Sequence, residues 1–161
     1  MCMSRAFVRE DDQDQPEAPP ELKVSNLPNW VTPRGLEMID AKLDALETAL
    51  AAGPGEAEEA WIRRDLRYWT HQRAGAQLAP PLPQDAETVA FGARVTIARG
   101  AGPEETIDIV GEDEADPAAG KLSWASPLAR ALTGAAVGEV VQLGGRTPPV
   151  EIEVLAIAPV P

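Results

Sequence analysis

The sequence has few of the residues on which most active sites depend. Its 161 residues include one cysteine, Cys2, and one histidine, His71. A single cysteine cannot form an internal disulfide, and a lone histidine cannot complete a zinc site. A glycine-rich phosphate loop, a nucleophile elbow and a Cys/His pair are also missing. We therefore expect a protein that is not an enzyme and that holds no cofactor or metal when free.

Long apolar runs are missing as well. The sequence has no stretch of about 18 apolar residues, and its first residues are acidic instead of basic and then apolar. It therefore predicts neither a membrane anchor nor a signal peptide. The expected location is the cytoplasm.

Positive charge is scarce, because 14 Lys and Arg stand against 26 Asp and Glu, which gives a net charge of −12. Residues 1–31 carry 3 basic and 6 acidic side chains, residues 32–79 carry 6 and 8, and residues 80–161 carry 5 and 12. Nucleic acid binding depends on Lys and Arg that displace counterions from phosphates. The charge balance thus argues against strong direct DNA binding and favours a protein partner.

The N-terminal part lacks the large apolar side chains that a folded segment buries. Residues 10–21, EDDQDQPEAPPE, combine acidic side chains with prolines. Such a composition does not offset the entropy cost of ordering the chain. We predict a flexible acidic tail over residues 1–31.

A helical hairpin is predicted over residues 32–79. Thr32 and Pro33 suit the N-cap and the first position of a helix. Apolar residues then recur with the spacing 3, 4, 3, 4, as in the seam of a coiled coil. These residues are Leu36, Ile39, Leu43, Leu46 and Leu50. The segment Gly53-Pro54-Gly55 ends this helix, and a second, antiparallel helix is expected from Glu56 to about Leu78.

A second domain is predicted over residues 84–161, after a stiff linker that contains Pro80, Pro81 and Pro83. Val89, Phe91, Val95 and Ile97 predict strands around a turn at Gly92, and strands are expected over four further segments. These segments are residues 106–110, 121–125, 137–143 and 150–157. Ser126-Pro127 is expected to start a helix through Leu132. The predicted fold class is α+β, with a helical hairpin followed by a mostly antiparallel sheet and one short helix.

Two acidic clusters allow more than one interpretation. The loop of residues 112–120 does not match the spacing of a calcium loop, so a solvated turn is the preferred interpretation. Glu56, Glu58 and Glu59 follow the hairpin bend, where acidic side chains favourably meet the N-terminal dipole of a helix. A functional role for these three carboxylates, at the end of a projecting rod, stays open.

Three tryptophans, Trp30, Trp61 and Trp69, fall in or beside the predicted hairpin. We expect them to stabilise the hairpin and its base as part of a hydrophobic core. The alternative is that Trp61 contacts a partner near the tip.

Several segments resemble one protein family. Residues 91–97 (FGARVTI), 109–117 (IVGEDEADP), 120–123 (GKLS), 126–132 (SPLARAL) and 137–141 (VGEVV) are similar, in this order, to the C-terminal domain of Gre transcript-cleavage and elongation factors. Residues 4–10 (SRAFVRE), 31–36 (VTPRGL) and 63–69 (RRDLRYW) also resemble this family, in particular its GreB-type branch.

The resemblance implies an N-terminal antiparallel coiled coil and a C-terminal FKBP-like domain. In this family the second domain docks at the rim of the RNA polymerase secondary channel, and the coiled coil enters the channel. The docking residues that the resemblance implies are Ser126, Pro127, Leu128 and Arg130. RNA polymerase is thus the expected partner, and a monomer is the expected oligomeric state.

The sequence departs from the family at the hairpin tip. Cleavage-stimulating members carry a motif close to DLSENAEY, whose carboxylates help to hold a magnesium ion in the polymerase active site. This motif is absent, and a first helix of about 20 residues extends only about 30 Å. The first hypothesis is therefore a regulator of elongation that binds the secondary channel with weak or no stimulation of cleavage. Its short hairpin resembles that of the regulator of nucleoside diphosphate kinase.

Two other hypotheses stay open. The chain would be a true cleavage factor if Glu56, Glu58 and Glu59 replaced the missing motif and reached the magnesium ion of the polymerase. Prolyl isomerase activity is suggested by the implied FKBP-like fold alone, and fold is a weak guide to function. Only Phe91 and Trp124 supply aromatic rings for such a pocket in the second domain.

Overall fold

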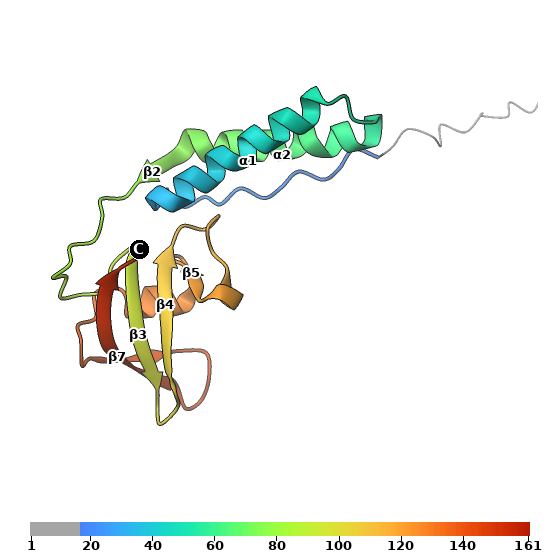
Figure 1. Cartoon of the computed structure of the whole chain (residues 1–161). Helices are drawn as coiled ribbons and strands as arrows, with labels where there is room; N and C mark the ends of the chain where they lie inside the picture. Colours follow the sequence, from blue (N-terminus) through green and yellow to red (C-terminus); the bar gives the residue numbers. More distant parts are fainter. Residues whose placement is uncertain (1–16) are drawn as a thin grey trace, which may run out of the picture.

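The computed structural model describes residues 17–161, so the predictions for residues 1–16 fall outside it. A helical hairpin stands on a five-stranded sheet domain, and residues 17–28 run extended beside the hairpin, from near its tip to its base (Figure 1). In chain order the elements are β1 (Asn29–Val31), α1 (Pro33–Ala51), α2 (Glu56–Gly75), β2 (Ala76–Leu78), β3 (Ala93–Arg99), β4 (Glu104–Val110), η1 (Pro117–Ala119), β5 (Lys121–Ser123), α3 (Pro127–Leu132), β6 (Val140–Leu143) and β7 (Val150–Pro159).

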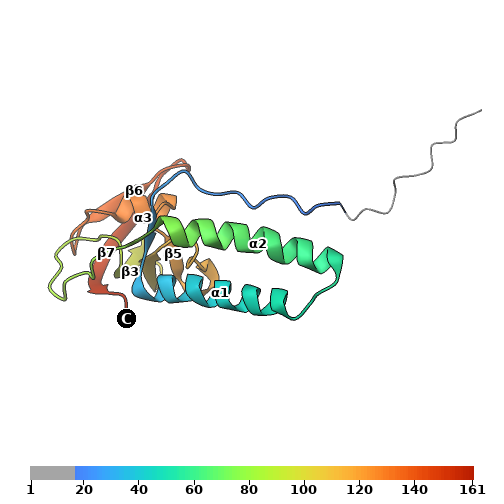
Figure 2. The same ribbon diagram turned by 90° about the horizontal axis from the view of Figure 1, so that it is seen from above.

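The hairpin begins as its sequence predicts. The backbone N–H of Gly35 donates to the Thr32 hydroxyl at 2.9 Å, which caps α1, and Pro33 occupies the first position. Helices α1 and α2 lie side by side (Figure 2). Ile39 and Ile62 are buried between or beneath them, and Leu43, Leu46 and Leu50 of the predicted seam are half-buried. Toward the base, Arg73 Nε of α2 donates to Asp40 Oδ1 of α1 at 2.5 Å.

The base of the hairpin differs from the prediction. Helix α2 ends at Gly75 instead of continuing to Leu78, because residues 76–78 form β2. This strand pairs in parallel with β1, from Asn29↔Ala76 to Val31↔Leu78. The predicted tail of residues 1–31 is therefore wrong for its last three residues. Val31 is fully buried, so this end of the segment gains the apolar contacts that its acidic part cannot make.

The sheet of the second domain has the strand order β5-β4-β3-β7-β6. All neighbouring strands are antiparallel except β4 and β5, and a bulge interrupts the β3–β7 register between Thr96 and Ile97. Helix α3 covers one face, where Ala129 and Leu132 pack with the inward residues of β3, β4 and β7. Those inward residues are Ala93, Val95, Ile97, Ile107, Ile109, Ile152 and Val154.

Three strands in this domain are shorter than the sequence predicts. Strand β5 ends at Ser123 instead of residue 125, because the Ser126 N–H donates back to the Ser123 carbonyl at 2.9 Å. Val89 lies outside any strand, where it exchanges backbone hydrogen bonds with Ala135 and Gly134. Strand β6 begins at Val140 instead of residue 137, because the preceding turn is closed by the Gly138 N–H bond to the Val154 carbonyl at 2.7 Å. Within residues 17–161 no helix is long and apolar enough to cross a membrane.

Candidate functional site

The start of α3 brings together the predicted docking residues. Ser126 is the N-cap, and its hydroxyl accepts from the Ala129 N–H at 3.3 Å. Pro127 follows at the first helical position and is exposed, as is Arg130 one turn later. Leu128 is half-buried against the core of the sheet domain. These four side chains thus form a small surface with a fixed backbone, one apolar anchor and one exposed guanidinium.

The hairpin tip carries the three predicted acidic residues in the first turn of α2. Within residues 17–161 no side chain caps this helix, so the backbone N–H groups of its first turn favour nearby carboxylates. Glu59 is held by Arg63 at 2.6 Å along the helix, whereas Glu56 and Glu58 are exposed and form no ion pair with any residue of 17–161. Two of the three carboxylates are therefore presented to solvent.

The three tryptophans occupy different environments. Trp30 approaches Phe91 of the sheet domain, with ring centroids 6.4 Å apart, and Trp69 is half-buried with its ring edge-on to Tyr68 at 5.2 Å. Trp61 is 50% exposed, so the prediction that it belongs to a hydrophobic core is wrong. The helical hairpin is too narrow to enclose a residue one position away from Ile62, which faces the seam.

The acidic loop after β4 packs against the hairpin through residues 113–114, so its interpretation as a solvated turn is wrong for this part, whereas residues 116–119 are exposed. Tyr68 donates to Asp113 Oδ1 at 2.7 Å, and Gln72 donates to Asp113 Oδ2 at 2.5 Å. Burial raises the pKa of the Tyr68 phenol above its usual value, and the hydrogen bond to Asp113 and the charges of Asp113 and Glu112 raise it further. One carboxylate of the loop therefore holds two side chains of α2.

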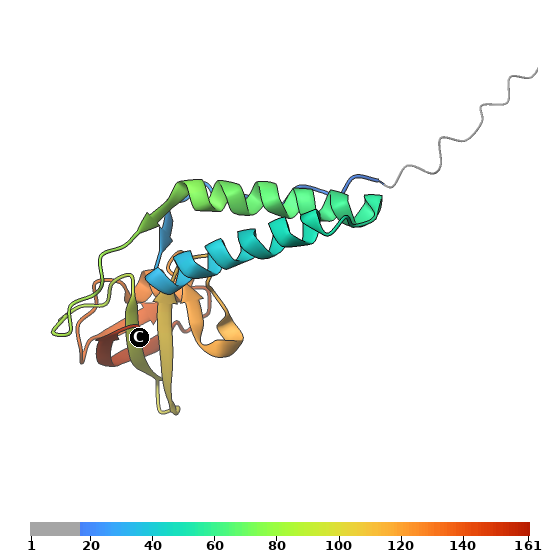
Figure 3. The ribbon, with the colours of Figure 1, turned by 45° about the horizontal axis from the view of Figure 1, so that its top comes forward.

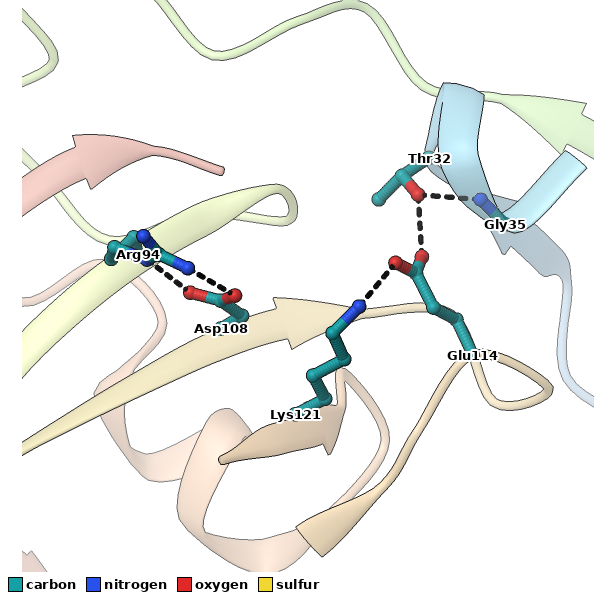
Figure 4. A network of polar contacts seen from close by, with 6 residues as sticks. All are labelled: Thr32, Gly35, Arg94, Asp108, Glu114 and Lys121. Atoms are coloured by element: carbon teal, nitrogen blue, oxygen red, sulfur yellow. Dashed lines mark hydrogen bonds and ion pairs between the residues drawn. The ribbon is translucent and has the colours of Figure 1, made fainter. Parts of the chain in front are cut away.

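A second carboxylate of the same loop holds α1. Glu114 is only 8% exposed, accepts from the Thr32 hydroxyl at 2.5 Å and lies 3.3 Å from Lys121 Nζ (Figure 4). The Thr32 hydroxyl thus accepts from the helix and donates to the loop at the same time. Next to the loop, a Cβ added at Gly111 would lie 2.5 Å from the Trp30 carbonyl oxygen, so only glycine allows this close approach.

These contacts define the junction, by which we mean residues 29–32 and 111–114 with Tyr68, Gln72 and Lys121. It joins both helices to the sheet domain and directs the rod past the edge of that domain (Figure 3). Sequence reasoning identified Thr32 as a cap but missed its second partner. The dense run of carboxylates in GEDEADP was the available signal, because buried acidic residues need donors from elsewhere in the chain.

Two crevices border the junction. One, of about 240 Å³, lies between the hairpin base, the linker and the sheet, beside the Arg94–Asp108 pair with its two hydrogen bonds of 2.7 and 2.8 Å. The other, of about 330 Å³, is lined by apolar side chains that include Trp30, Phe91 and Trp124. The carboxylates that line the first crevice, Asp108 and Glu114, are both engaged by cations. Both carboxylates therefore serve to stabilise the fold.

Comparison with known proteins identifies relatives along most of the chain. Residues 84–159 match the family described as "Transcription elongation factor, GreA/GreB, C-term". The transcription elongation factor GreB of Neisseria meningitidis serogroup A is 34% identical over 151 residues, which cover 80% of this chain and 93% of that protein. The transcription elongation factor GreA of Ralstonia nicotianae is 31% identical over 157 residues, with coverages of 83% and 98%.

Among solved structures, GreA factor homolog 1 (Gfh1) of Thermus thermophilus matches with 21% identity and a TM-score of 0.39, over 80% of this chain and 97% of that one. The family is shown by the sequence relatives, because they exceed 30% identity over nearly their whole length. The chain therefore belongs to the GreA/GreB family of transcription elongation factors.

Proposed function

We propose that this protein regulates transcription elongation by binding RNA polymerase at its secondary channel. In this proposal the sheet domain, with an FKBP-like topology, docks at the channel rim through Ser126, Pro127, Leu128 and Arg130. The hairpin enters the channel as a short coiled coil. Family membership and the exposure of Pro127 and Arg130 support the proposal. The protein acts as a cytoplasmic monomer and makes no strong direct contact with DNA.

The observation that carries the finer part of the proposal is the length of the rod. Helix α1 has 19 residues, which corresponds to about 29 Å at roughly 1.5 Å per residue. Because the turn at residues 52–55 follows at once, nothing extends the rod further. A rod of this length suits occupation of the channel mouth more than contact with the catalytic centre. We therefore propose weak or no stimulation of transcript cleavage.

The chemistry of the tip agrees with this proposal. Carboxylates that help to hold magnesium must place oxygens about 2.0 to 2.1 Å from the ion. Glu59 is paired with Arg63, whereas Glu56 and Glu58 have no ion-pair partner among residues 17–161 and can turn toward a metal. Their backbone is fixed by helix α2, which limits how far either carboxylate reaches beyond the tip.

The alternative is a true cleavage factor in which Glu56, Glu58 and Glu59 act as the acidic tip. The exposure of Glu56 and Glu58 favours this alternative. The magnesium ion would then belong to the polymerase active site, and the tip would complete its ligand shell and help to activate water. The free protein would hold no metal in either case.

One experiment tests both functions. RNA cleavage is measured in reconstituted, backtracked elongation complexes while binding of the protein to polymerase is followed in the same samples. Binding without cleavage above polymerase alone supports the channel-occupying regulator. Cleavage that is lost in the Glu56→Gln/Glu58→Gln/Glu59→Gln variant, with binding retained, supports the alternative. The absence of binding at micromolar concentration would refute both.

A further inference from the structure

Trp61 is the most exposed aromatic side chain among residues 17–161, and it lies near the tip of the rod. Half of its surface is accessible, in the second turn of α2 from the tip. An exposed indole leaves apolar area in water, which the fold does not require at a position facing away from the seam. Tryptophan is also among the residues that contribute most to protein–protein interfaces.

Helical spacing places this side chain on a particular face of α2. Trp61, Asp65, Tyr68 and Gln72 are separated by four, three and four residues, so they lie along one side of the helix. Tyr68 and Gln72 bond to Asp113 of the sheet domain. Trp61 therefore continues the face of α2 that carries Tyr68 and Gln72, nearer to the tip. At that end the hairpin extends past the sheet domain (Figure 3).

The indole ring is held in place on one side. The Arg64 guanidinium lies 4.6 Å from the ring centroid, and its side chain is only 13% exposed. Arg64 Nε also donates to Asp65 Oδ1 at 2.8 Å, so this guanidinium is both oriented and neutralised. The ring thus loses little rotational freedom when a partner covers its open side, which lowers the entropy cost of binding.

The surrounding charge selects the kind of partner. Glu58, three residues before Trp61 and on the same side of the helix, is exposed and forms no ion pair within residues 17–161. The hairpin that carries the patch, residues 32–79, has 6 basic and 8 acidic side chains, and residues 80–161 have 5 and 12, so both parts are net acidic. Phosphates would be repelled from such a surface, whereas Lys or Arg side chains would be attracted to it.

We propose that Glu58 and Trp61 form a docking patch for a Lys- or Arg-bearing protein surface of RNA polymerase. A cation of the partner stacks on the open face of the indole and pairs with the Glu58 carboxylate. The patch rests on the proposed function, since it names a contact made while the hairpin is in the channel. It adds a second contact, distant in sequence from the one at the start of α3.

Equilibrium binding of the full chain to core RNA polymerase tests the patch. We expect Trp61→Ala to weaken binding by about tenfold or more, Trp61→Phe to keep most of the affinity, and Glu58→Lys to weaken binding severalfold. Val137→Ala is the matched control, because Val137 is 56% exposed and lies in the sheet domain away from the patch. Thermal unfolding of each variant confirms that exposed substitutions leave the fold intact.

A photo-crosslinking residue at position 61 identifies the partner directly. Crosslinks to a Lys- or Arg-bearing segment of a polymerase subunit support the patch, and crosslinks confined to RNA or DNA overturn it. Binding by Trp61→Ala within about twofold of the unchanged chain would overturn the patch alone. Failure of the unchanged chain to bind polymerase would overturn the proposed function and the patch together, so the two failures are distinguishable.

Discussion

The carboxylates at the two ends of the hairpin differ in their exposure and in their partners. At the base, Glu114 is buried and Asp113 is half-buried, and each carboxylate accepts from two side chains. Asp113 accepts from Tyr68 and Gln72, and Glu114 accepts from Thr32 and Lys121. At the tip, Glu56 and Glu58 are exposed without ion-pair partners in residues 17–161. The contacts that orient the hairpin relative to the sheet domain are thus concentrated where the two meet. The tip keeps groups that another molecule can engage, so substitutions should affect stability at one end and binding at the other.

The largest loss of stability is expected at the closest backbone approach of the junction. Gly111→Ala would place a Cβ 2.5 Å from the Trp30 carbonyl oxygen. Relief of this clash requires the backbone at residue 30 or residue 111 to shift. We expect a destabilisation of about 2 to 4 kcal/mol, measured by urea unfolding. The matched control at the tip is Gly55→Ala, where an added Cβ meets nothing within 4 Å. Equal stability of the two variants would break the contrast between base and tip.

The next largest effect is expected for the hydroxyl that serves both the helix and the loop. Thr32→Ala removes the cap on Gly35 and one donor to the buried Glu114 carboxylate. We expect a loss of about 2 kcal/mol in the free energy of unfolding. Thr32→Ser keeps the hydroxyl and should recover most of this loss. A Thr32→Ser variant as unstable as Thr32→Ala would mean that the methyl group, and not the hydrogen bonds, matters.

A smaller effect should appear at high pH, through the only tyrosine of the chain. The pKa of Tyr68 is raised in the folded state, chiefly by burial and then by its bond to Asp113, so the neutral phenol stabilises the fold. This contribution is complete below the unfolded pKa of about 10 and is lost as the pH rises toward the folded pKa. Stability should therefore fall above about pH 10.

Absorbance of the phenolate reports this titration directly, because no second tyrosine contributes. The midpoint should lie above about 10 in buffer and return to about 10 in denaturant. Tyr68→Phe should abolish the signal and cost about 1 kcal/mol at neutral pH, since Asp113 loses one donor. A midpoint near 10 in the folded protein would show that the Tyr68–Asp113 contact is not formed.

The smallest effect is expected for the ion pair at the tip. Arg63→Gln removes the partner of Glu59, but both side chains are largely exposed, so the loss should be only about 0.3 to 0.5 kcal/mol. Added salt should reduce even this difference, because exposed pairs are screened. A loss above about 1 kcal/mol would show that the tip is held as firmly as the base.

The sequence predicted the parts of the fold that depend on neighbouring residues. The caps at Thr32 and Ser126 and the turn after α1 all follow from side chains within a few positions. The junction was not predicted, because its contacts join distant segments: Thr32 and Glu114 are 82 residues apart. The β1–β2 pair escaped prediction for the same reason, since three-residue strands carry almost no periodic signal.

The candidate site was predicted unevenly. The residues at the start of α3 were named from the family resemblance, and the structure places them on one exposed turn, although their docking role stays a proposal. The sequence did not decide whether Trp61 is buried in a core or exposed near the tip. A tryptophan beside the seam and one on the seam differ by a single position, and the loop that could have covered Trp61 reaches only as far as Tyr68.

The parallel pairing of β1 and β2 has a consequence for how such a protein can evolve. Helix α1 follows β1 (Asn29–Val31) almost at once, and α2 leads directly into β2 (Ala76–Leu78). The pairing of β1 with β2 therefore joins the two ends of the hairpin at its base. Insertion or deletion of matched helical turns near residues 52–55 would change the length of the rod without disturbing its foundation. Small insertions and deletions can thereby change how far the hairpin extends into a partner while the sheet domain stays the same.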